Sequence, residues 1–228
     1  MKFYLLLISL LVLAVIPVKA QDAKPVADQE AEYTRTITTR ARKIVTALNI
    51  SDAEKADRIT EIIALQYRNL NTIHADRDEK IKSAKTSGAE KSAIEAAIKN
   101  AEDDANVKLA KLHDSYLLEL SAELSPSQVE QVKDGMTYGV LPITYRGYLD
   151  MLQNLTDEQK LQIRKWLEEA REHAMDAESS EKKHWWFGKY KGRINNYLSA
   201  AGYDMKKEGE EWQKRIKARE AEKKGSKN

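Results

Sequence analysis

The residues best suited to chemistry gather in one stretch near the C-terminal end, EKKHWWFGKYKGRINNYLSAAGYD, residues 181–204. Its candidate binding side chains are three aromatic rings, a guanidinium and two amides: Trp185, Trp186, Tyr190, Arg193, Asn195 and Asn196. Aromatic rings with polar neighbours are suited to stacking on sugar rings and fixing their hydroxyls, and arginine pairs with carboxylates such as those of uronates. The stretch therefore predicts a carbohydrate-binding surface.

Neighbouring segments could extend this surface. The preceding helix could contribute His173 and Asp176, and the segment TYRGY could contribute Tyr145 and Arg146. His173 and Asp176 are three residues apart on one helix face, where they could form part of a metal site. No HExxH pattern or other full ligand set accompanies them. We therefore expect neither a metal ion nor another cofactor.

No catalytic signature accompanies the stretch. The chain has no GxSxG sequence, no phosphate-binding loop and no cysteine, so a cysteine nucleophile and a thiolate metal site are excluded. Pairs of acidic residues do not specify a glycosidase without geometry when they lie on helices this rich in Asp and Glu. The sequence favours a binding protein over an enzyme.

A helix over residues 185–201 would have two faces. Apolar side chains at helical spacing form the first face, which is typical of core packing: Trp186, Tyr190, Ile194, Tyr197, Leu198 and Ala201. Gly188 and Gly192 lie on the second, small and polar face. Each glycine costs a helix roughly 1 kcal/mol relative to alanine, so two on one face predict close approach of a helix or of a ligand, and we favour a helix. Gly202 predicts a left-handed C-cap.

The elements that position these residues are expected to be helices. Strand-like alternation is nearly absent, and apolar residues recur every three or four positions along residues 52–85 and 89–124. Only TSG lies between these segments, so they predict a long antiparallel hairpin, with an earlier helix over 27–48 alongside. Four capping boxes are predicted: Ser51 with Glu54, Ser87 with Glu90, Ser125 with Gln128, and Thr156 with Gln159. The expected fold class is all-α.

Aromatic content divides the chain into two regions. Eleven of the fourteen Phe, Trp and Tyr residues after residue 20 lie between Tyr138 and Trp212. We expect an N-terminal helix and the hairpin over residues 21–137 and a compact, aromatic-rich helical head over 138–212. The charged residues 213–228 predict a frayed tail. Gly139 and Pro142 predict a non-helical segment before a short helix over residues 145–152.

Residues 1–20 have the composition of a secretory signal peptide. Lys2 precedes an apolar run over residues 3–16, and Val18 and Ala20 fit cleavage before Gln21. The run is shorter than the ~20 apolar residues that span a bilayer. Cleavage would leave 36 basic and 36 acidic residues, a balance that argues against nucleic-acid binding. Since no cysteine is present for lipid attachment, we expect a soluble protein in the periplasm or outside the cell, without membrane attachment.

The run from residue 141 to 212 resembles a family of secreted bacterial proteins of unknown function that is described as sugar-binding. The resemblance is most specific in the segments KYKGRINNYLSAAGYD and EAREHAMDA. The hairpin matches the family mainly in its pattern of residues. The resemblance implies a mostly helical exported protein that accompanies polysaccharide-degrading systems, and it supplies no catalytic residue. The predicted function is a non-catalytic carbohydrate-binding accessory protein of polysaccharide utilisation. Its partner would be an oligosaccharide or polysaccharide, including one that contains uronate.

A second resemblance is to small helical periplasmic chaperones marked by Leu-Thr-x-x-Gln boxes. LTDEQ at residues 155–159 fits this pattern, and LSPSQ at 124–128 fits it with serine in place of threonine. Both boxes are also ordinary helix N-caps. The alternative function is therefore a periplasmic chaperone or scaffold that acts through the hairpin, the surface through which a homodimer would also form.

Overall fold

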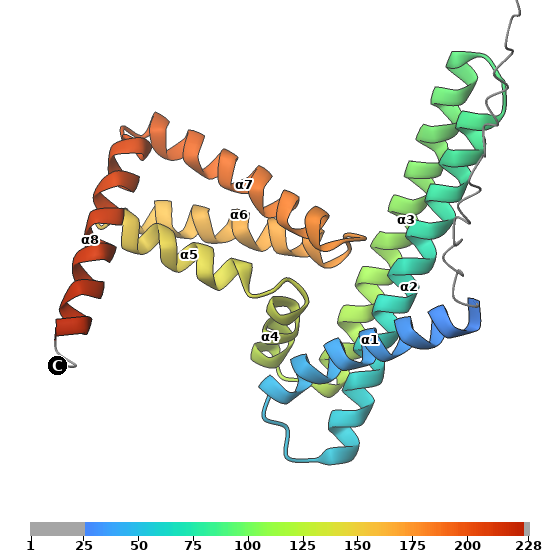
Figure 1. The fold of residues 1–228 in the computed structure, drawn as a ribbon, viewed down its shortest axis with the longest axis horizontal. Coiled ribbons are helices and arrows are strands. Elements are labelled where there is room, and N and C mark those ends of the chain that lie inside the picture. Colours follow the sequence, from blue (N-terminus) through green and yellow to red (C-terminus); the bar gives the residue numbers. More distant parts are fainter. Residues whose placement is uncertain (1–25, 226–228) are drawn as a thin grey trace, which may run out of the picture.

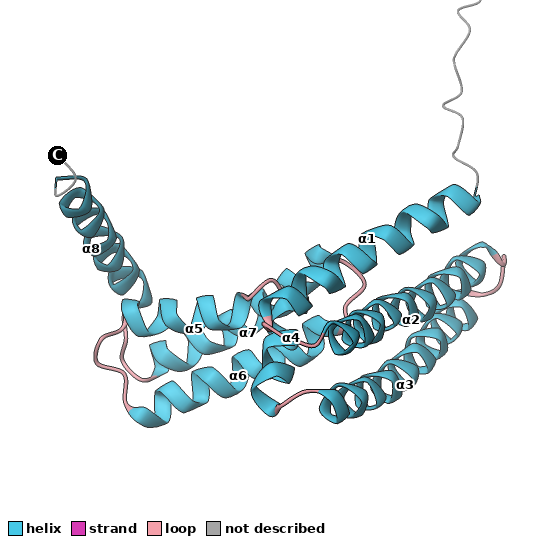
Figure 2. Ribbon diagram, turned by 90° about the horizontal axis from the view of Figure 1, so that it is seen from below, coloured by secondary structure: helices cyan, strands magenta, loops and turns pink. Residues whose placement is uncertain are grey.

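The computed structural model describes residues 26–225, which form eight α-helices and, within that range, no strand (Figures 1 and 2). The all-α prediction is confirmed. The signal peptide predicted for residues 1–20 lies outside the described residues. Two helical layers meet at an angle in Figure 1: α1 to α3 make one body, and α5 to α8 make the other, with α4 between them.

The first body is the predicted hairpin with a helix across its base. α2 (Ala53–Thr86) and α3 (Lys91–Glu123) run antiparallel, and α1 (Val26–Ala47) packs against α2 (Figure 1). α4 (Pro126–Met136) closes the same core from the other side. The fully buried side chains of this core come from all four helices and include Ile37, Ala41, Ile59, Ile63, Leu120 and Val132. Burial of each such aliphatic side chain stabilises the fold by about 1.5–3 kcal/mol.

The hairpin changes character toward its tip. The residues buried there are small, Ala101 and Ala105, and ion pairs join the two helices instead. Lys80 Nζ lies 3.0 Å from Asp104 Oδ2, and Lys108 Nζ lies 3.2 Å from Asp76 Oδ2. Exposed pairs of this kind contribute little stability each. The tip is therefore held mainly by helix pairing rather than by a large apolar core.

The second body is the aromatic head. It contains α5 (Val140–Met151), α6 (Asp157–Met175), α7 (Ser180–Ala200) and α8 (Met205–Gly225), with α6 and α7 packed side by side (Figures 1 and 2). Its core is filled from α5, α6 and α7 by Leu152, Ile163, Leu167, Phe187, Ile194 and Leu198. The aromatic-rich region that the sequence separates thus has its own core.

Two of the four predicted capping boxes are confirmed. Ser125 and Gln128 cap α4, and Thr156 and Gln159 cap α6, with both reciprocal hydrogen bonds present. The box at Ser51 is wrong by one residue, because the carboxylate of Asp52 accepts the hydrogen bond from Lys55 N. The box at Ser87 is also wrong, since Ser87 is the C-cap of α2 and the side chain of Glu90 makes no cap hydrogen bond.

The structure corrects two further predictions in the head. α5 begins at Val140 and includes Pro142 in its first turn, where the missing N–H of proline costs nothing. The residues predicted as a frayed tail continue α8 to Gly225. α8 is anchored on α5, because Arg219 binds the Asp150 carboxylate through both terminal nitrogens at 3.1 and 2.7 Å, and Arg215 donates to the Met151 carbonyl oxygen at 2.9 Å.

Candidate functional site

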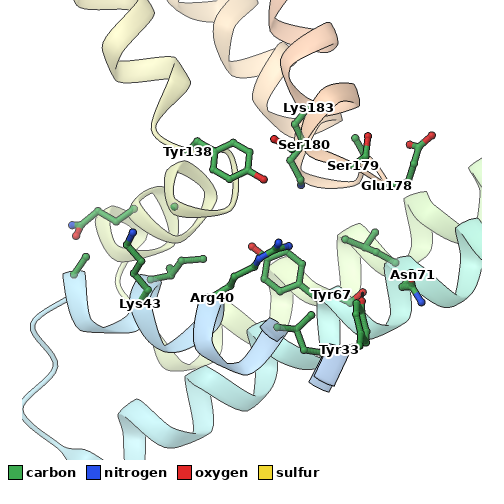
Figure 3. Close-up of a pocket in the computed structure, with 17 residues that line it drawn as sticks. Tyr33, Arg40, Lys43, Tyr67, Asn71, Tyr138, Glu178, Ser179, Ser180 and Lys183 are labelled. Carbon is green, nitrogen blue, oxygen red and sulfur yellow. Dashed lines mark hydrogen bonds between the residues drawn. The ribbon is translucent and has the colours of Figure 1, made fainter. Parts of the chain in front are cut away.

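A pocket of about 620 Å³ lies where the two bodies meet (Figure 3). Its walls come from α1, α2, the end of α4 and the turn that joins α6 to α7. The polar side chains that line it are Tyr33, Arg40, Lys43, Tyr67, Asn71, Gln131, Tyr138, Glu178, Ser179, Ser180 and Lys183. Ligand pockets in proteins commonly have volumes of about 300–1,000 Å³. This pocket has the size and the polar lining of a small-molecule site.

Two tyrosines form the wall beside α2. The Tyr33 hydroxyl donates a hydrogen bond to the Tyr67 carbonyl oxygen at 3.0 Å, which ties α1 to α2. The Tyr67 hydroxyl makes no hydrogen bond to any residue of the described chain. Burial raises the pKa of Tyr67 to about 12, so this hydroxyl keeps its proton at neutral pH. It is a hydrogen-bond donor left free to meet a ligand.

A third tyrosine, Tyr138, forms the rim in a strained conformation. Its φ of 59° and the φ of 66° at Gly139 place consecutive residues in the left-handed region. That conformation costs a residue with a side chain about 1 kcal/mol, and such strain concentrates at functional sites. The Tyr138 ring is 50% exposed and stacks on His184 of α7, with ring centroids 5.6 Å apart. The strained turn thus holds an aromatic face beside the pocket.

Cations outnumber anions in the lining. Arg40 and Lys43 project from neighbouring turns of α1 (Figure 3), and neither makes a hydrogen bond or an ion pair with the residues described. Glu178 is the acid of the lining, and its carboxylate lies 3.4 Å from Arg77 Nη2. The lining consequently contains more positively than negatively charged side chains.

Lys183 is the third cation, and it is buried, with 6% of its surface exposed. Its Nζ donates to the carbonyl oxygens of Ala174 and Met175 at 2.9 and 3.0 Å, two carbonyl groups in the last turn of α6. Burial lowers the pKa of Lys183 to about 8, with Arg40 acting in the same direction and Asp176 opposing. Lys183 therefore stabilises the α6–α7 turn and also adds positive charge to the pocket.

A cluster of charged residues holds this turn against the hairpin. The His113 imidazolium donates to Asp176 Oδ2 at 2.9 Å and lies 3.3 Å from Glu172 Oε2. These carboxylates raise the pKa of His113 to about 10, so the ring is charged at neutral pH. His74 of α2 adds a 2.7 Å hydrogen bond to the Asp176 carbonyl oxygen. The geometry of the pocket depends on this cluster because the turn forms one of its walls.

The structure separates the three aromatic residues of the predicted binding surface. Tyr190 is buried in the core of the head. Trp186 is half-buried and stacks on His173 at a centroid distance of 4.3 Å. Trp185 is 53% exposed and meets Trp186 edge-on. Only the two tryptophans share a surface, which Lys189 covers from 4.9 Å above the Trp186 ring.

The predicted polar residues are also dispersed. Arg193 stacks over the Trp166 ring at 4.6 Å, and the Asn195 amide oxygen accepts a 2.7 Å hydrogen bond from the Tyr148 hydroxyl. Asn196 and Arg146 are exposed. The Tyr145 ring lies 5.9 Å from the Arg164 guanidinium. None of these residues lines the pocket at the junction.

His173 and Asp176 point to different parts of the molecule. His173 stacks on Trp186 on the α6–α7 surface, whereas Asp176 pairs with His113 of the hairpin. The idea that they share a metal site is therefore not supported by their geometry. Among residues 26–225, no group of three or more His, Asp or Glu side chains is arranged to hold a metal ion.

The prediction that Gly188 and Gly192 allow close helix packing is wrong. A Cβ atom built on either glycine would meet no atom within 4 Å from the described part of the chain, so their face of α7 is open. Gly202 does adopt the predicted left-handed conformation, with φ at 97°, and Tyr203 N donates to the Leu198 carbonyl oxygen. This closes α7 with the expected C-cap.

Sequence reasoning missed the pocket because its residues come from distant parts of the chain. Tyr33 and Arg40 lie in the first helix, Tyr67 in the second and Lys183 near the start of the seventh. The one local signal was Tyr138 directly before Gly139, at the boundary of the aromatic region. A bulky residue in a glycine turn is a reason to examine its surroundings.

Comparison with known proteins identifies a family and no curated relative. No helix in residues 26–225 is long and apolar enough to cross a membrane. No curated protein matches the chain. Residues 34–218, which include nearly all of both bodies, match the family described as "Protein of unknown function (DUF3826)". The chain belongs to this family, whose description assigns no function.

Proposed function

We propose that this protein is an exported, non-catalytic carbohydrate-binding protein, an accessory of polysaccharide utilisation, and that its ligand occupies the pocket at the junction of the two bodies. The observation that carries the proposal is the lining itself. Three tyrosines surround a concave site of about 620 Å³ in which several polar groups have no partner in the described chain.

The chemistry of the lining suits a sugar. A tyrosine offers an apolar ring face against which the C–H face of a sugar can pack, and a hydroxyl at the ring tip. The free hydroxyl of Tyr67 and the amide of Asn71 can bind sugar hydroxyls. Asn71 and Arg40 are exposed and Tyr67 is half-buried, so their polar groups are accessible to a ligand that enters the pocket. The resemblance to a family described as sugar-binding points the same way.

The features that support carbohydrate binding give less support to the chaperone alternative. The outer part of the hairpin carries interhelical ion pairs, including Lys80 with Asp104. Charged pairs offer little to the apolar segments of an unfolded client. Within the lining, the single acid, Glu178, is paired with Arg77, so the lining offers no pair of carboxyl groups for glycoside hydrolysis, which favours binding over turnover.

The test is a thermal-shift screen of residues 21–228 against neutral and acidic oligosaccharides, followed by titration calorimetry on each hit. A ligand at 100 times its Kd should stabilise the protein by about 2.7 kcal/mol. Tyr67→Phe, which removes one hydroxyl and keeps the ring, should weaken binding about tenfold. Trp185→Ala serves as the matched control on the α7 surface and should leave the affinity unchanged.

The outcomes separate three cases. Loss of affinity in Tyr67→Phe alone supports the pocket. Loss in Trp185→Ala alone would move the ligand to the tryptophan surface of α7 and contradict the proposed location. A flat screen across all oligosaccharides would contradict carbohydrate binding altogether.

A further inference from the structure

We propose that the pocket selects an acidic sugar, and that the carboxylate or sulfate group of this sugar binds between Arg40 and Lys183. This inference rests on the proposed carbohydrate-binding function and adds the chemical class of the ligand. It comes from the charges of the pocket rather than from its aromatic walls.

The first observation is that Arg40 and Lys183 extend into the same pocket from two sides (Figure 3). Arg40 lies on α1 and Lys183 on α7, and the charge of Arg40 adds to burial in lowering the pKa of Lys183. Arg40 also acts on the hydroxyls of Tyr33 and Tyr67. Two like charges that face each other raise the free energy of the empty site. An anion between them would remove that repulsion.

The second observation is that two other cations with little exposed surface, Arg171 and Lys133, have acidic partners. Arg171, with 3% of its side chain exposed, binds Asp134 at 2.7 Å and also Glu130. Lys133 lies 3.0 Å from Glu172. Lys183 is as buried as these residues, yet its hydrogen bonds go to neutral carbonyl groups. No carboxylate of the described chain forms an ion pair with Lys183, and Asp176 and Glu178 act on it only from a longer distance, so the site can accept an anionic ligand.

The third observation concerns the geometry of the donors. An ammonium group has three hydrogen atoms, and the two carbonyl groups at the end of α6 occupy two of those on Lys183. One remains for a ligand. The Arg40 guanidinium has no hydrogen-bond partner in the described chain, and its planar fork matches a carboxylate or a sulfate with two parallel hydrogen bonds. Together they can bind one acidic group from two sides.

The experiment compares ligands that differ only in charge. Titration calorimetry of residues 21–228 with trigalacturonate and with its methyl ester keeps the sugar rings and removes the negative charge. A sulfated galactose trisaccharide distinguishes sulfate from carboxylate. We expect the carboxylate or the sulfate ligand to bind at least tenfold more tightly than the neutral ester, and the difference to shrink at high salt.

Two variants locate the acidic group. Arg40→Gln should lower the affinity for the acidic sugar about tenfold or more and leave that for the ester unchanged. Arg42→Gln is the matched control, because Arg42 is exposed on the same helix and lies outside the pocket. Both variants remove one positive charge from α1, so a difference between them reports position and not net charge.

Deprotonation gives an independent readout on Lys183. In the free protein its pKa is near 8, and the groups that face it are Asp176, Glu178, Arg40 and the hydroxyl of Tyr67. An acidic ligand prefers the charged amine, so affinity for the acid should fall as pH rises from 7 to 9.5. Affinity for the methyl ester should not follow this profile.

The possible failures are distinct. Equal affinity for acid and ester would overturn the inference while leaving carbohydrate binding intact. Unchanged acid binding in both Arg40→Gln and Arg42→Gln would do the same. Equal losses in Arg40→Gln and Arg42→Gln would also overturn it, because a general electrostatic attraction would then explain the preference. Failure of both acid and ester to bind would overturn the inference together with the proposed function.

Discussion

At the scale of single residues, two residues of the pocket adopt energetically unfavourable states. Tyr138 adopts a backbone conformation that disfavours any residue with a side chain. Lys183 keeps an ammonium group buried beside neutral carbonyls. Both residues line the same pocket. A strained backbone and a buried ammonium group in one pocket are better explained by a binding site than by the fold alone.

The strain at Tyr138 leads to a prediction in which stability and binding change in opposite directions. Asparagine tolerates the left-handed region better than tyrosine, so Tyr138→Asn should keep or raise the free energy of unfolding, by up to about 1 kcal/mol. The same change removes the aromatic rim and should weaken ligand binding about fivefold or more. Urea denaturation and calorimetry on one preparation measure the two effects.

Tyr138→Phe is the control for that experiment. It keeps the ring and the strained backbone, so its stability should match that of the unaltered protein. A clear loss of stability in Tyr138→Asn would show that the stacking of Tyr138 on His184 matters more to the fold than the strain does.

At the scale of elements, α7 carries two different faces. Phe187, Ile194 and Leu198 are fully buried in the head, and this face accounts for why the segment folds as a helix. The opposite face exposes Gly188 and Gly192 to open space. In a helix interior, glycine without a packing role is a weakness.

Replacing these exposed glycines should stabilise the protein. Gly188→Ala and Gly192→Ala should each raise the free energy of unfolding by about 0.5–1 kcal/mol, because alanine loses less backbone entropy and its methyl group meets no neighbour. Chemical denaturation measures the change. If either alanine instead abolished binding of a confirmed ligand, the open face of α7 would belong to the binding surface.

Gly135 provides the opposite case in α4. A Cβ atom there would lie 2.9 Å from Ile44 Cγ1 of α1, so the buried Ile44 side chain or the helices would have to shift. Gly135→Ala should therefore destabilise the protein by about 1–3 kcal/mol. Equal effects at Gly135 and Gly188 would mean that the approach of α1 to α4 is looser than described.

The elements themselves were largely predictable from the sequence. The periodicity of apolar residues identified α1, α2 and α3 to within two residues at each end, and the Ser125 and Thr156 caps identified the starts of α4 and α6. The start of α5 was missed because Pro142 was interpreted as a break although it lies in a first turn. The helical end of α8 was missed because its polar composition hides the anchoring of Arg215 and Arg219 on α5.

The candidate site was not predictable in the same way. Aromatic composition drew attention to α7, and there it reports the core and an exposed tryptophan pair. The pocket depends on how α1 and α7 meet, and no spacing within either segment encodes that meeting. Arg40 looks in sequence like any solvated helix charge. Its lack of an acidic partner is visible only once every neighbouring side chain is placed.

At the scale of the whole molecule, the two bodies are joined by a charged contact whose strength depends on pH. His113 of α3 binds Asp176 and Glu172 of the head. Burial would raise the pKa of Glu172, but the hydrogen bonds from His113 and Lys133 outweigh it and lower that pKa to about 2. The contact therefore keeps its full charge over the neutral range.

The pH dependence of this contact can be predicted with its sign. The pKa of His113 is about 10 in the folded protein and 6.5 in an unperturbed histidine, so its stabilisation is complete below pH 6.5 and is lost as pH rises through 10. His113→Gln should cost about 3 kcal/mol near pH 6 and much less near pH 10. Urea denaturation at pH 6, 8 and 10 measures this convergence. A cost that does not vary with pH would mean that His113 acts through packing alone.

The position of the pocket along the chain has a consequence for how the protein becomes active. Its walls unite residues near position 40 with residues near position 183, and bringing them together closes a loop of roughly 140 residues at an entropic cost that later contacts must offset. Apart from Met175 of α6, which is buried in the core of the first body, the core residues of each body are close to one another along the chain or come from its own helices. During folding, the chain would thus acquire its helices early and any ligand affinity only at the final docking step. Ligand binding would then report complete folding, which helical content alone does not.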